Sequence, residues 1–431
     1  MLTLPKMNRY IPFTLEQINA LRKKYPTPFY VYDERGIRHS ARLLYSYFPW
    51  NKEFKEFFPI KALPNPEVIK ILKEEGCYAD CSSIPELMIA DGVGLKKNSI
   101  IFTSNDTSLE ELSKARELNV IINLDDPNHL NYLEKVASLP EILCLRYNPG
   151  PFKRGQKIVW RNLKDDKFGM RKDQLLETYK RGLRKGIRRF GLHMMIISND
   201  LNMKHFIDSV KLCFAIAIEL KSSLGINLEF IDFGGGLGIP YHPDQKQVDI
   251  SDIANKIHKI YQELIESGKL NECAIFLEAG RLITGQHGYL VSSVRHIKQS
   301  YKLFAGLDAS MTALMRPGMY GSYHHISILS KNSKQMNTYD VVGSLCENND
   351  KFAINRKLPV LEEGDIVVIH DVGAYGRGKV FDFNGKLRPA EFLLQTDGTF
   401  RMIRRAETVN DYFGTLLNWK VTNTSLIRRK G

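Results

Sequence analysis

The 431-residue sequence lacks a long hydrophobic run. A membrane-spanning helix needs about 18 or more consecutive apolar residues, but the longest candidate, residues 213–218, is followed closely by Glu219 and Lys221. The amino-terminal stretch M-L-T-L-P-K-M-N-R-Y also has no apolar signal-peptide core. The sequence therefore predicts a cytoplasmic protein with no membrane partner.

Paired cysteines and clusters of basic residues are also scarce. The six cysteines form no C-x-x-C pair and no zinc-type spacing with histidine, so we expect free thiols and no metal. The net charge of +13 favours anions such as phosphorylated cofactors or carboxylate substrates. Because the Lys and Arg residues are dispersed along the chain, the sequence does not favour a nucleic-acid partner.

Between residues 55 and 285, short β-rich runs alternate with longer stretches that carry a helical apolar period, such as residues 66–75. Most runs are continuously apolar, as strands buried on both faces are. Eight strands with helical crossovers predict a (β/α)8 TIM barrel of the α/β class, with a doubly wound sheet as the alternative. The eight runs are 57–62, 77–82, 99–104, 119–125, 142–148, 189–197, 228–234 and 275–280.

After residue 285 the sequence becomes rich in short β segments separated by turn residues, which predicts a C-terminal all-β domain. An early strand at 28–33 could belong to either part. We predict a barrel domain over residues 37–285, and a β-sandwich or β-barrel domain formed by residues 1–36 and 286–431. The β segments are 288–296, 301–307, 340–344, 364–371 and 390–394.

Reactive residues fall at the ends of several predicted strands, where a barrel builds its active site. Lys61 ends the first run, and burial there would lower the pKa of its amine, as a Schiff-base nucleophile requires. An exposed edge lysine is the alternative. The seventh run leads into the glycines of segment 234–238, whose backbone N–H groups can approach a phosphate. A dinucleotide fingerprint would need glycine where Ile239 stands.

The eighth run ends in Glu278-Ala279-Gly280-Arg281. A carboxylate there can pair with a protonated ring nitrogen, and the arginine can bind a carboxylate or phosphate in a bidentate manner. A structural ion pair explains these two residues equally well. Taken together, the lysine, the phosphate loop and the glutamate predict pyridoxal 5'-phosphate as cofactor.

These motifs, in this order, resemble the alanine-racemase-type-fold decarboxylases that use pyridoxal phosphate, and most closely the diaminopimelate decarboxylase family. The resemblance covers roughly residues 27 to 415. It rests on T-P-F-Y-V-Y-D (27–33), I-K-A-L-P-N-P (60–66), D-C-S-S-I-P-E-L (80–87), F-G-G-G-L-G-I-P-Y (233–241), E-A-G-R (278–281), R-P-G-M-Y (316–320), G-S-L-C-E-N-N-D (343–350) and D-V-G-A-Y-G (371–376).

The resemblance implies a role for each matching residue. Lys61 would carry the cofactor, with Asp80 behind it and Gly280 among the cofactor-binding residues. The phosphate contacts would be Gly235, Gly236 and Tyr375, with Ser198 as a further candidate. Glu278 would face the pyridine nitrogen. The substrate carboxylate would bind Arg281, Arg316 and Tyr320. Cys346, the proton donor, and Glu347, which reads the distal amino group, would come from the partner of a homodimer with shared active sites.

Two positions depart clearly from the family pattern G-x-H-x-H-x-G-S. Met195 stands where a histidine usually stacks on the cofactor ring, and Ile197 stands where a glycine usually precedes Ser198. A third, milder departure is Ala279 in place of proline. Methionine is polarizable and packs well on aromatic rings, so we expect Met195 to lie against the cofactor.

The resemblance implies decarboxylation of meso-2,6-diaminopimelate to L-lysine and CO2. The alternative within the class is a decarboxylase of another amino acid, or of a carboxylated polyamine or siderophore precursor. A racemase is disfavoured because these use a catalytic tyrosine where this chain has C-E-N-N-D. A non-catalytic regulatory homologue is disfavoured because Lys61, Glu278 and Cys346 are all present.

Overall fold

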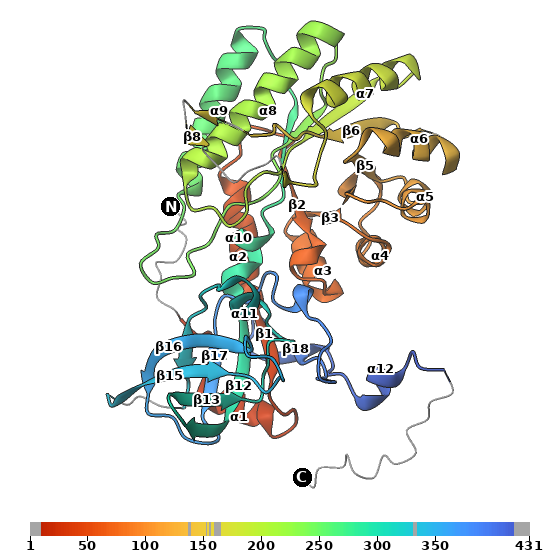
Figure 1. The fold of residues 1–431 in the computed structure, drawn as a ribbon. Helices are drawn as coiled ribbons and strands as arrows, with labels where there is room; N and C mark the ends of the chain where they lie inside the picture. The colour runs from red at the N-terminus through yellow and green to blue at the C-terminus, as the bar shows by residue number, and fades with distance from the viewer. Residues whose placement is uncertain are drawn as a thin grey trace. The chain divides into compact units, whose positions relative to one another are not determined.

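The computed structural model describes residues 10–136, 139–151, 153–154, 157–158, 165–330 and 334–417. The chain forms two compact units (Figure 1). Within the described residues, the first unit contains residues 34–287 and 373–378, and the second contains residues 10–33, 288–372 and 379–417. The sequence assigned 373–378 to the β domain, but this segment packs with the first unit. Its Tyr375 N–H donates to the carbonyl oxygen of Ala62 at 2.8 Å.

The first unit is built on a closed barrel of eight parallel strands in the order β10-β11-β2-β3-β4-β5-β6-β9. Each predicted run overlaps one of these strands, so the TIM barrel is confirmed and the doubly wound alternative is wrong. The strands are β2 (Lys55–Pro59), β3 (Tyr78–Cys81), β4 (Ile100–Ser104), β5 (Ile121–Leu124), β6 (Ile142–Arg146), β9 (Arg189–His193), β10 (Phe230–Asp232) and β11 (Ala274–Leu277).

Helices connect the barrel strands and cover their outer side (Figure 1). Local signals set their ends: α3 begins at Pro66 after Asn65, whose side chain accepts the N–H of Glu67, and α8 is capped by Gly225 in the left-handed conformation. The helices are α2 (Glu34–Ser46), α3 (Pro66–Glu74), α4 (Ile84–Gly92), α5 (Leu109–Glu117), α6 (Pro127–Val136), α7 (Lys172–Arg184), α8 (Met203–Leu224), α9 (Ile250–Glu266) and α10 (Gly280–Thr284). Short elements are η1 (Ile60–Ala62), η2 (Lys97–Ser99), η4 (Gly285–His287), β7 (Lys153–Arg154) and β8 (Lys157–Ile158).

One end of the barrel interior is filled by apolar side chains. Phe57, Phe230 and Phe276 are buried there, and the rings of Phe230 and Phe276 stack with centroids 4.5 Å apart. Other members of this cluster, Ile121 and Ile142, begin their strands, whereas the polar residues Asp232 and His193 end theirs. The interior is therefore a packed core with a polar opening at one end.

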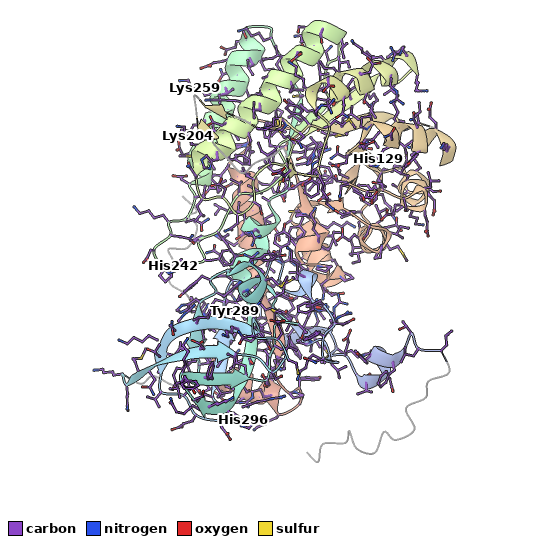
Figure 2. All side chains as sticks on the ribbon, viewed as in Figure 1. His129, Lys204, His242, Lys259, Tyr289 and His296 are labelled. Atoms are coloured by element: carbon purple, nitrogen blue, oxygen red, sulfur yellow. The ribbon has the colours of Figure 1, made fainter. Side chains whose placement is uncertain are left out.

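The second unit is a nine-stranded mixed sheet with the main order β16-β15-β13-β12-β1-β18-β19, in which β17 pairs with β12 and β14. Strand β1 (Phe29–Asp33) lies between β12 and β18, so the early strand belongs to this unit. Tyr289 (Figure 2) packs edge-on against Phe13 in its core, with ring centroids 5.4 Å apart.

The other strands of this sheet are β12 (Gly288–Gln299), β13 (Leu303–Leu307), β14 (Ile326–Ile328), β15 (Met336–Val342), β16 (Lys351–Pro359), β17 (Ile366–Ile369), β18 (Ala390–Leu394) and β19 (Phe400–Arg404). Its helices are α1 (Leu15–Arg22), α11 (Arg316–Tyr320) and α12 (Val409–Phe413), and η5 (Arg377–Lys379) lies where the chain re-enters the unit. Within the described residues, no helix is both long and apolar enough to cross a membrane.

Candidate active site

The carboxyl ends of the barrel strands surround a cavity of about 450 Å³. Its lining includes seven of the residues that the sequence predicts: Lys61, Met195, Ser198, Gly236, Glu278, Arg281 and Tyr375. All seven belong to the first unit. The polar groups predicted at separate strand ends therefore meet in one cavity, as a barrel requires.

Lys61 lies in the short helix η1, two residues after β2 ends at Pro59, and not within the strand as the sequence predicted. Its Nζ is 2.5 Å from Oδ2 of Asp80, which is fully buried on β3. The expected lowering of the lysine pKa is wrong for this cofactor-free side chain. The Lys61 side chain is 43% exposed, so it is only partly desolvated. Desolvation lowers the pKa, but the charges of Asp80 and Glu278 raise it above its ordinary value. Burial raises the pKa of Asp80 to about 7, even though Lys61 opposes the shift.

The glycine loop after β10 is closely packed. A Cβ on Gly235 would lie 2.2 Å from the carbonyl oxygen of Glu278, and one on Gly236 would lie 2.4 Å from that of Ile197. Gly236 also has a φ of +93°, which other residues rarely adopt. Only glycine fits at these positions, and the loop is held against the strands on either side.

Met195 lines the cavity beside this loop. Its Sδ accepts a hydrogen bond from the backbone N–H of Gly235, with the nitrogen and sulfur 3.2 Å apart. Ser198 lines the cavity nearby. Gly280 is not part of the lining. It allows α10 to begin against Pro59, because a Cβ there would lie 2.5 Å from that ring.

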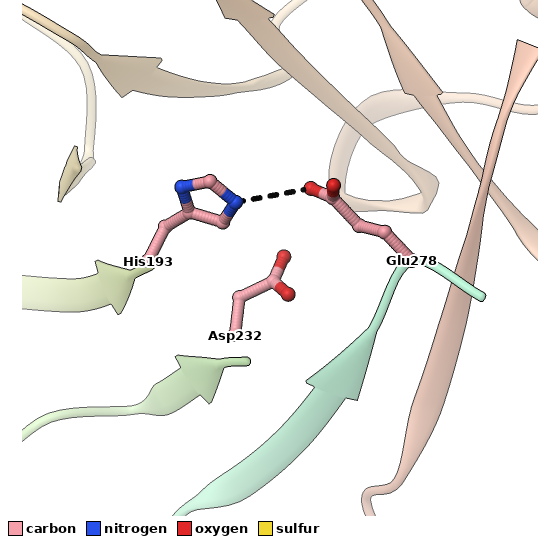
Figure 3. A group of neighbouring side chains, drawn as sticks. All are labelled: His193, Asp232 and Glu278. Carbon is pink, nitrogen blue, oxygen red and sulfur yellow. Dashed lines mark ion pairs between the residues drawn. The ribbon is translucent and has the colours of Figure 1, made fainter. Parts of the chain in front are cut away.

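Glu278 follows β11 and is buried next to His193 and Asp232 (Figure 3). Its Oε1 lies 3.4 Å from Nε2 of His193. Burial alone would raise the pKa of Glu278, but His193, Lys61 and Arg146 together lower it to about 2. Glu278 is therefore a carboxylate at neutral pH and can face a cation in the cavity.

Two arginines bring positive charge to the cavity. The guanidinium of Arg281 donates to the hydroxyl of Tyr241 and lies 4.7 Å from the ring centroid of Tyr375. Among the described residues, no carboxylate lies within ion-pair distance of Arg281. Sequence reasoning did not single out Arg146, which ends β6, pairs with Asp125 at 3.3 Å and stacks on Phe168 at 4.6 Å.

The remaining predicted residues lie in the second unit. Arg316 begins α11 and is buried, whereas Tyr320 at the end of that helix is 55% exposed. Cys346 is exposed, unlike the other five cysteines. The loop that carries Cys346 and Glu347 is fixed by Asp350, whose carboxylate accepts the backbone N–H groups of Leu345 and Met311.

The first-unit residues fit pyridoxal phosphate. The glycine loop is a cradle that a Cβ would fill, and Oε1 of Glu278 is buried without a hydrogen-bond partner among the described residues. Lys61 supplies an amine in the same cavity. A barrel with this site defines a pyridoxal-phosphate-dependent enzyme.

Comparison with known proteins gives the family. A family model described as "Pyridoxal-dependent decarboxylase, pyridoxal binding domain" matches residues 35–285. The chain therefore belongs to the pyridoxal-dependent decarboxylases.

Two curated relatives align over nearly the whole chain. It is 39% identical to protein TabA of Pseudomonas amygdali pv. tabaci over 400 residues, which cover 93% of each chain. It is 36% identical to diaminopimelate decarboxylase of Methanothermobacter thermautotrophicus over 398 residues, covering 91% of this chain and 92% of the relative.

Solved structures agree with this assignment. Diaminopimelate decarboxylase of M. jannaschii in complex with L-lysine superposes with a TM-score of 0.86 and 30% identity, covering 92% of this chain and 94% of that one. The Helicobacter pylori enzyme with L-lysine gives a TM-score of 0.83 and 29% identity, covering 92% and 98%.

Proposed function

We propose that the protein decarboxylates meso-2,6-diaminopimelate, releasing CO2 and L-lysine. The observation that carries this proposal is Arg281, a buried guanidinium in the cavity of Lys61 with no carboxylate partner among the described residues. A substrate with two carboxylates supplies one that leaves and one that an arginine can hold in a bidentate manner. Relatives named diaminopimelate decarboxylase support the choice of substrate.

When bound, pyridoxal phosphate supplies a ring that accepts the electron pair left by departing CO2. The residues of this chain prepare that chemistry. Asp80 Oδ2 accepts a hydrogen bond from Nζ of Lys61 and fixes where that amine lies in the cavity. Glu278 would hold a positive charge opposite its buried carboxylate. The glycine loop would hold an anion through the N–H of Gly236, and through that of Gly235 once it leaves Sδ of Met195. The apolar side chains of Ile196 and Ile197 exclude water, which favours loss of a charged carboxylate as a neutral molecule.

We also propose a homodimer in which Cys346 and Glu347 of each protomer serve the partner's cavity. Exposure of Cys346 and the hydrogen bonds that Asp350 makes to the loop around it support this assignment. The thiol would protonate the α-carbon and the carboxylate would bind the distal ammonium group of the substrate.

One observation favours a different amino-acid substrate. Met195 replaces the expected histidine in the cavity, and the relative at 39% identity, TabA, has a name that states no activity. A different substrate would leave the decarboxylase class unchanged but alter the groups that Arg281 and Glu347 must bind.

The experiment that separates these candidates is CO2 release by the purified holoenzyme from a panel of amino acids: the diaminopimelate stereoisomers, lysine, ornithine and arginine. We expect release from the meso isomer, with L-lysine as product. CO2 release from another member of the panel, and none from diaminopimelate, would contradict the proposed substrate. The visible absorbance of bound cofactor, measured on the same sample, tests the non-catalytic alternative.

A further inference from the structure

Three buried side chains meet where β9, β10 and β11 end: His193, Asp232 and Glu278 (Figure 3). Each offers an oxygen or nitrogen atom, and these atoms lie within 4.8 Å of one another. Among the described residues, both ring nitrogens of His193, Oδ2 of Asp232 and Oε1 of Glu278 lack a well-formed hydrogen bond, although Nε2 of His193 lies 3.4 Å from Oε1 of Glu278. A buried polar atom without a hydrogen-bond partner costs about 1–3 kcal/mol of folding stability. The three groups would avoid this cost if they shared a proton or bound a cation.

Two carboxylates this close do not both ionise readily in a buried site. The surroundings of each carboxylate decide which one takes up a proton. Glu278 faces the ring of His193 and the positive charges of Lys61 and Arg146. In the part of the chain that the structure describes, Asp232 accepts only the backbone N–H of Gly234, at 2.8 Å on Oδ1. Burial and the charge of Glu278 raise the pKa of Asp232 well above its ordinary range.

We propose that Asp232 is a positioning residue that stays protonated and directs the proton of its Oδ2 toward Glu278, while neutral His193 donates from Nε2 to the same carboxylate. The cluster then carries one negative charge, located on Glu278. Two donors fix the orientation of that carboxylate, which leaves its charge available to a cation in the cavity. This inference rests on the proposed function, because the cation that Glu278 would face is the protonated ring of the cofactor.

The same three ligands could instead surround a divalent cation. The structure favours a proton on Asp232 over a bound metal ion, because Lys61 and Arg146 already supply positive charge around Glu278. A metal would also need Asp232 to be ionised in a pocket where its neighbours oppose ionisation. The titratable groups that act on Asp232 are Glu56, Asp80, Lys61, His193, Glu278, Cys144 and Cys213.

The first test compares Asp232→Asn with Asp232→Ala. Asparagine has the shape of a protonated aspartic acid and can accept from Gly234 and donate to Glu278, but it cannot ionise. We expect D232N to bind pyridoxal phosphate about as tightly as wild type, with an unchanged pH dependence of the visible spectrum. D232A should weaken cofactor binding roughly 5- to 150-fold, because the donor to Glu278 is lost. Equal weakening in D232N, or a shifted pH midpoint, would overturn the proposal.

The second test applies to the wild-type holoenzyme and holds even if a variant fails to fold. Infrared spectra are recorded about one unit above the pKa of Asp80, which is about 7, with and without 13C-labelled aspartate. We expect the carbonyl stretch of a protonated carboxylic acid that shifts in D2O and on aspartate labelling. Absence of this band means that Asp232 is ionised. A stoichiometric metal ion that is lost in His193→Gln would also refute the assignment.

Neither test needs a substrate. Failure to release CO2 from diaminopimelate would therefore count against the proposed function and leave the protonation state of Asp232 to be judged by the spectra alone.

Discussion

Replacing Gly235 by alanine tests how tightly the glycine loop fixes Glu278. The added Cβ would lie 2.2 Å from the carbonyl oxygen of Glu278, and real Cβ contacts essentially never fall below 3.0 Å. The obstacle is backbone, so no side-chain rotation can relieve the clash. The N–H of Glu278 also donates to the carbonyl oxygen of Gly234 at 2.9 Å, so the loop and the strand end must move together.

We expect two separate losses in Gly235→Ala. Overpacking of a closely packed site typically costs about 1–3 kcal/mol of folding stability, and a misplacement near 1 Å can cost about 100-fold in turnover. Urea denaturation measures the first loss. Titration of apoenzyme with pyridoxal phosphate and steady-state CO2 release measure the second.

Gly92→Ala is the matched control, because Gly92 ends α4 and an added Cβ there meets nothing within 4 Å. It should leave cofactor affinity and turnover at wild-type levels. If G235A also keeps both at wild-type levels, the loop does not position Glu278 and our description of the cradle is wrong.

The remaining predictions concern the lysine, the methionine, a partly buried histidine and the dimer. Lys61→Ala should abolish both turnover and the visible band of bound cofactor, and persistence of the band would contradict the assignment. Met195→His should retain cofactor and add an inflection near pH 6.5 to the turnover profile, whereas Met195→Leu should not; identical profiles would show that position 195 does not face the reacting groups. Burial lowers the pKa of His287 to about 4. The stability this residue contributes should be full above about pH 6.5 and lost as the pH falls through 4, up to about 3 kcal/mol. His287→Gln should flatten the fall of the unfolding free energy at acid pH. If the variant and the wild type lose stability in parallel as the pH falls, the lowered pKa of His287 is refuted. Mixing inactive Lys61→Ala and Cys346→Ala chains should restore about a quarter of wild-type activity if Cys346 acts in the partner's site, because half the dimers are mixed and each has one intact site. No recovery despite proven subunit exchange would contradict this.

The barrel could be predicted from the sequence because each strand is an apolar run bounded by helical periodicity. The ends of the strands were harder to place. Lys61 lies in a 3-10 turn beyond β2, since the pattern I-K-A-L continues the apolar run and hides the change of backbone conformation. Tyr375 lies far along the chain in a β-rich region, and the contacts that bring it to the barrel, such as its hydrogen bond to Ala62, cannot be foreseen from the sequence.

Part of the site could also be predicted, because charged residues stand out at the ends of apolar strands. Lys61 and Glu278 were found because a charged residue interrupts an apolar strand end, and Arg146 and Asp232 give the same signal at the ends of β6 and β10. Their roles depend on neighbours from other strands, which the sequence does not order in space. The pKa of Lys61 shows the limit most clearly: burial alone predicts a lowered value, and the nearby carboxylates reverse it.

The measurement that tests the central claim most directly is chemical reduction of the holoenzyme with borohydride, followed by peptide mapping. Reduction makes the bond between the cofactor and its amine permanent, so the modified residue can be identified by mass. We predict a single modified peptide, with the cofactor on Lys61, and no modification of the Glu278→Gln variant if that change empties the site. A cofactor found on any other lysine, or none on a protein that still releases CO2, would contradict this assignment of the active site.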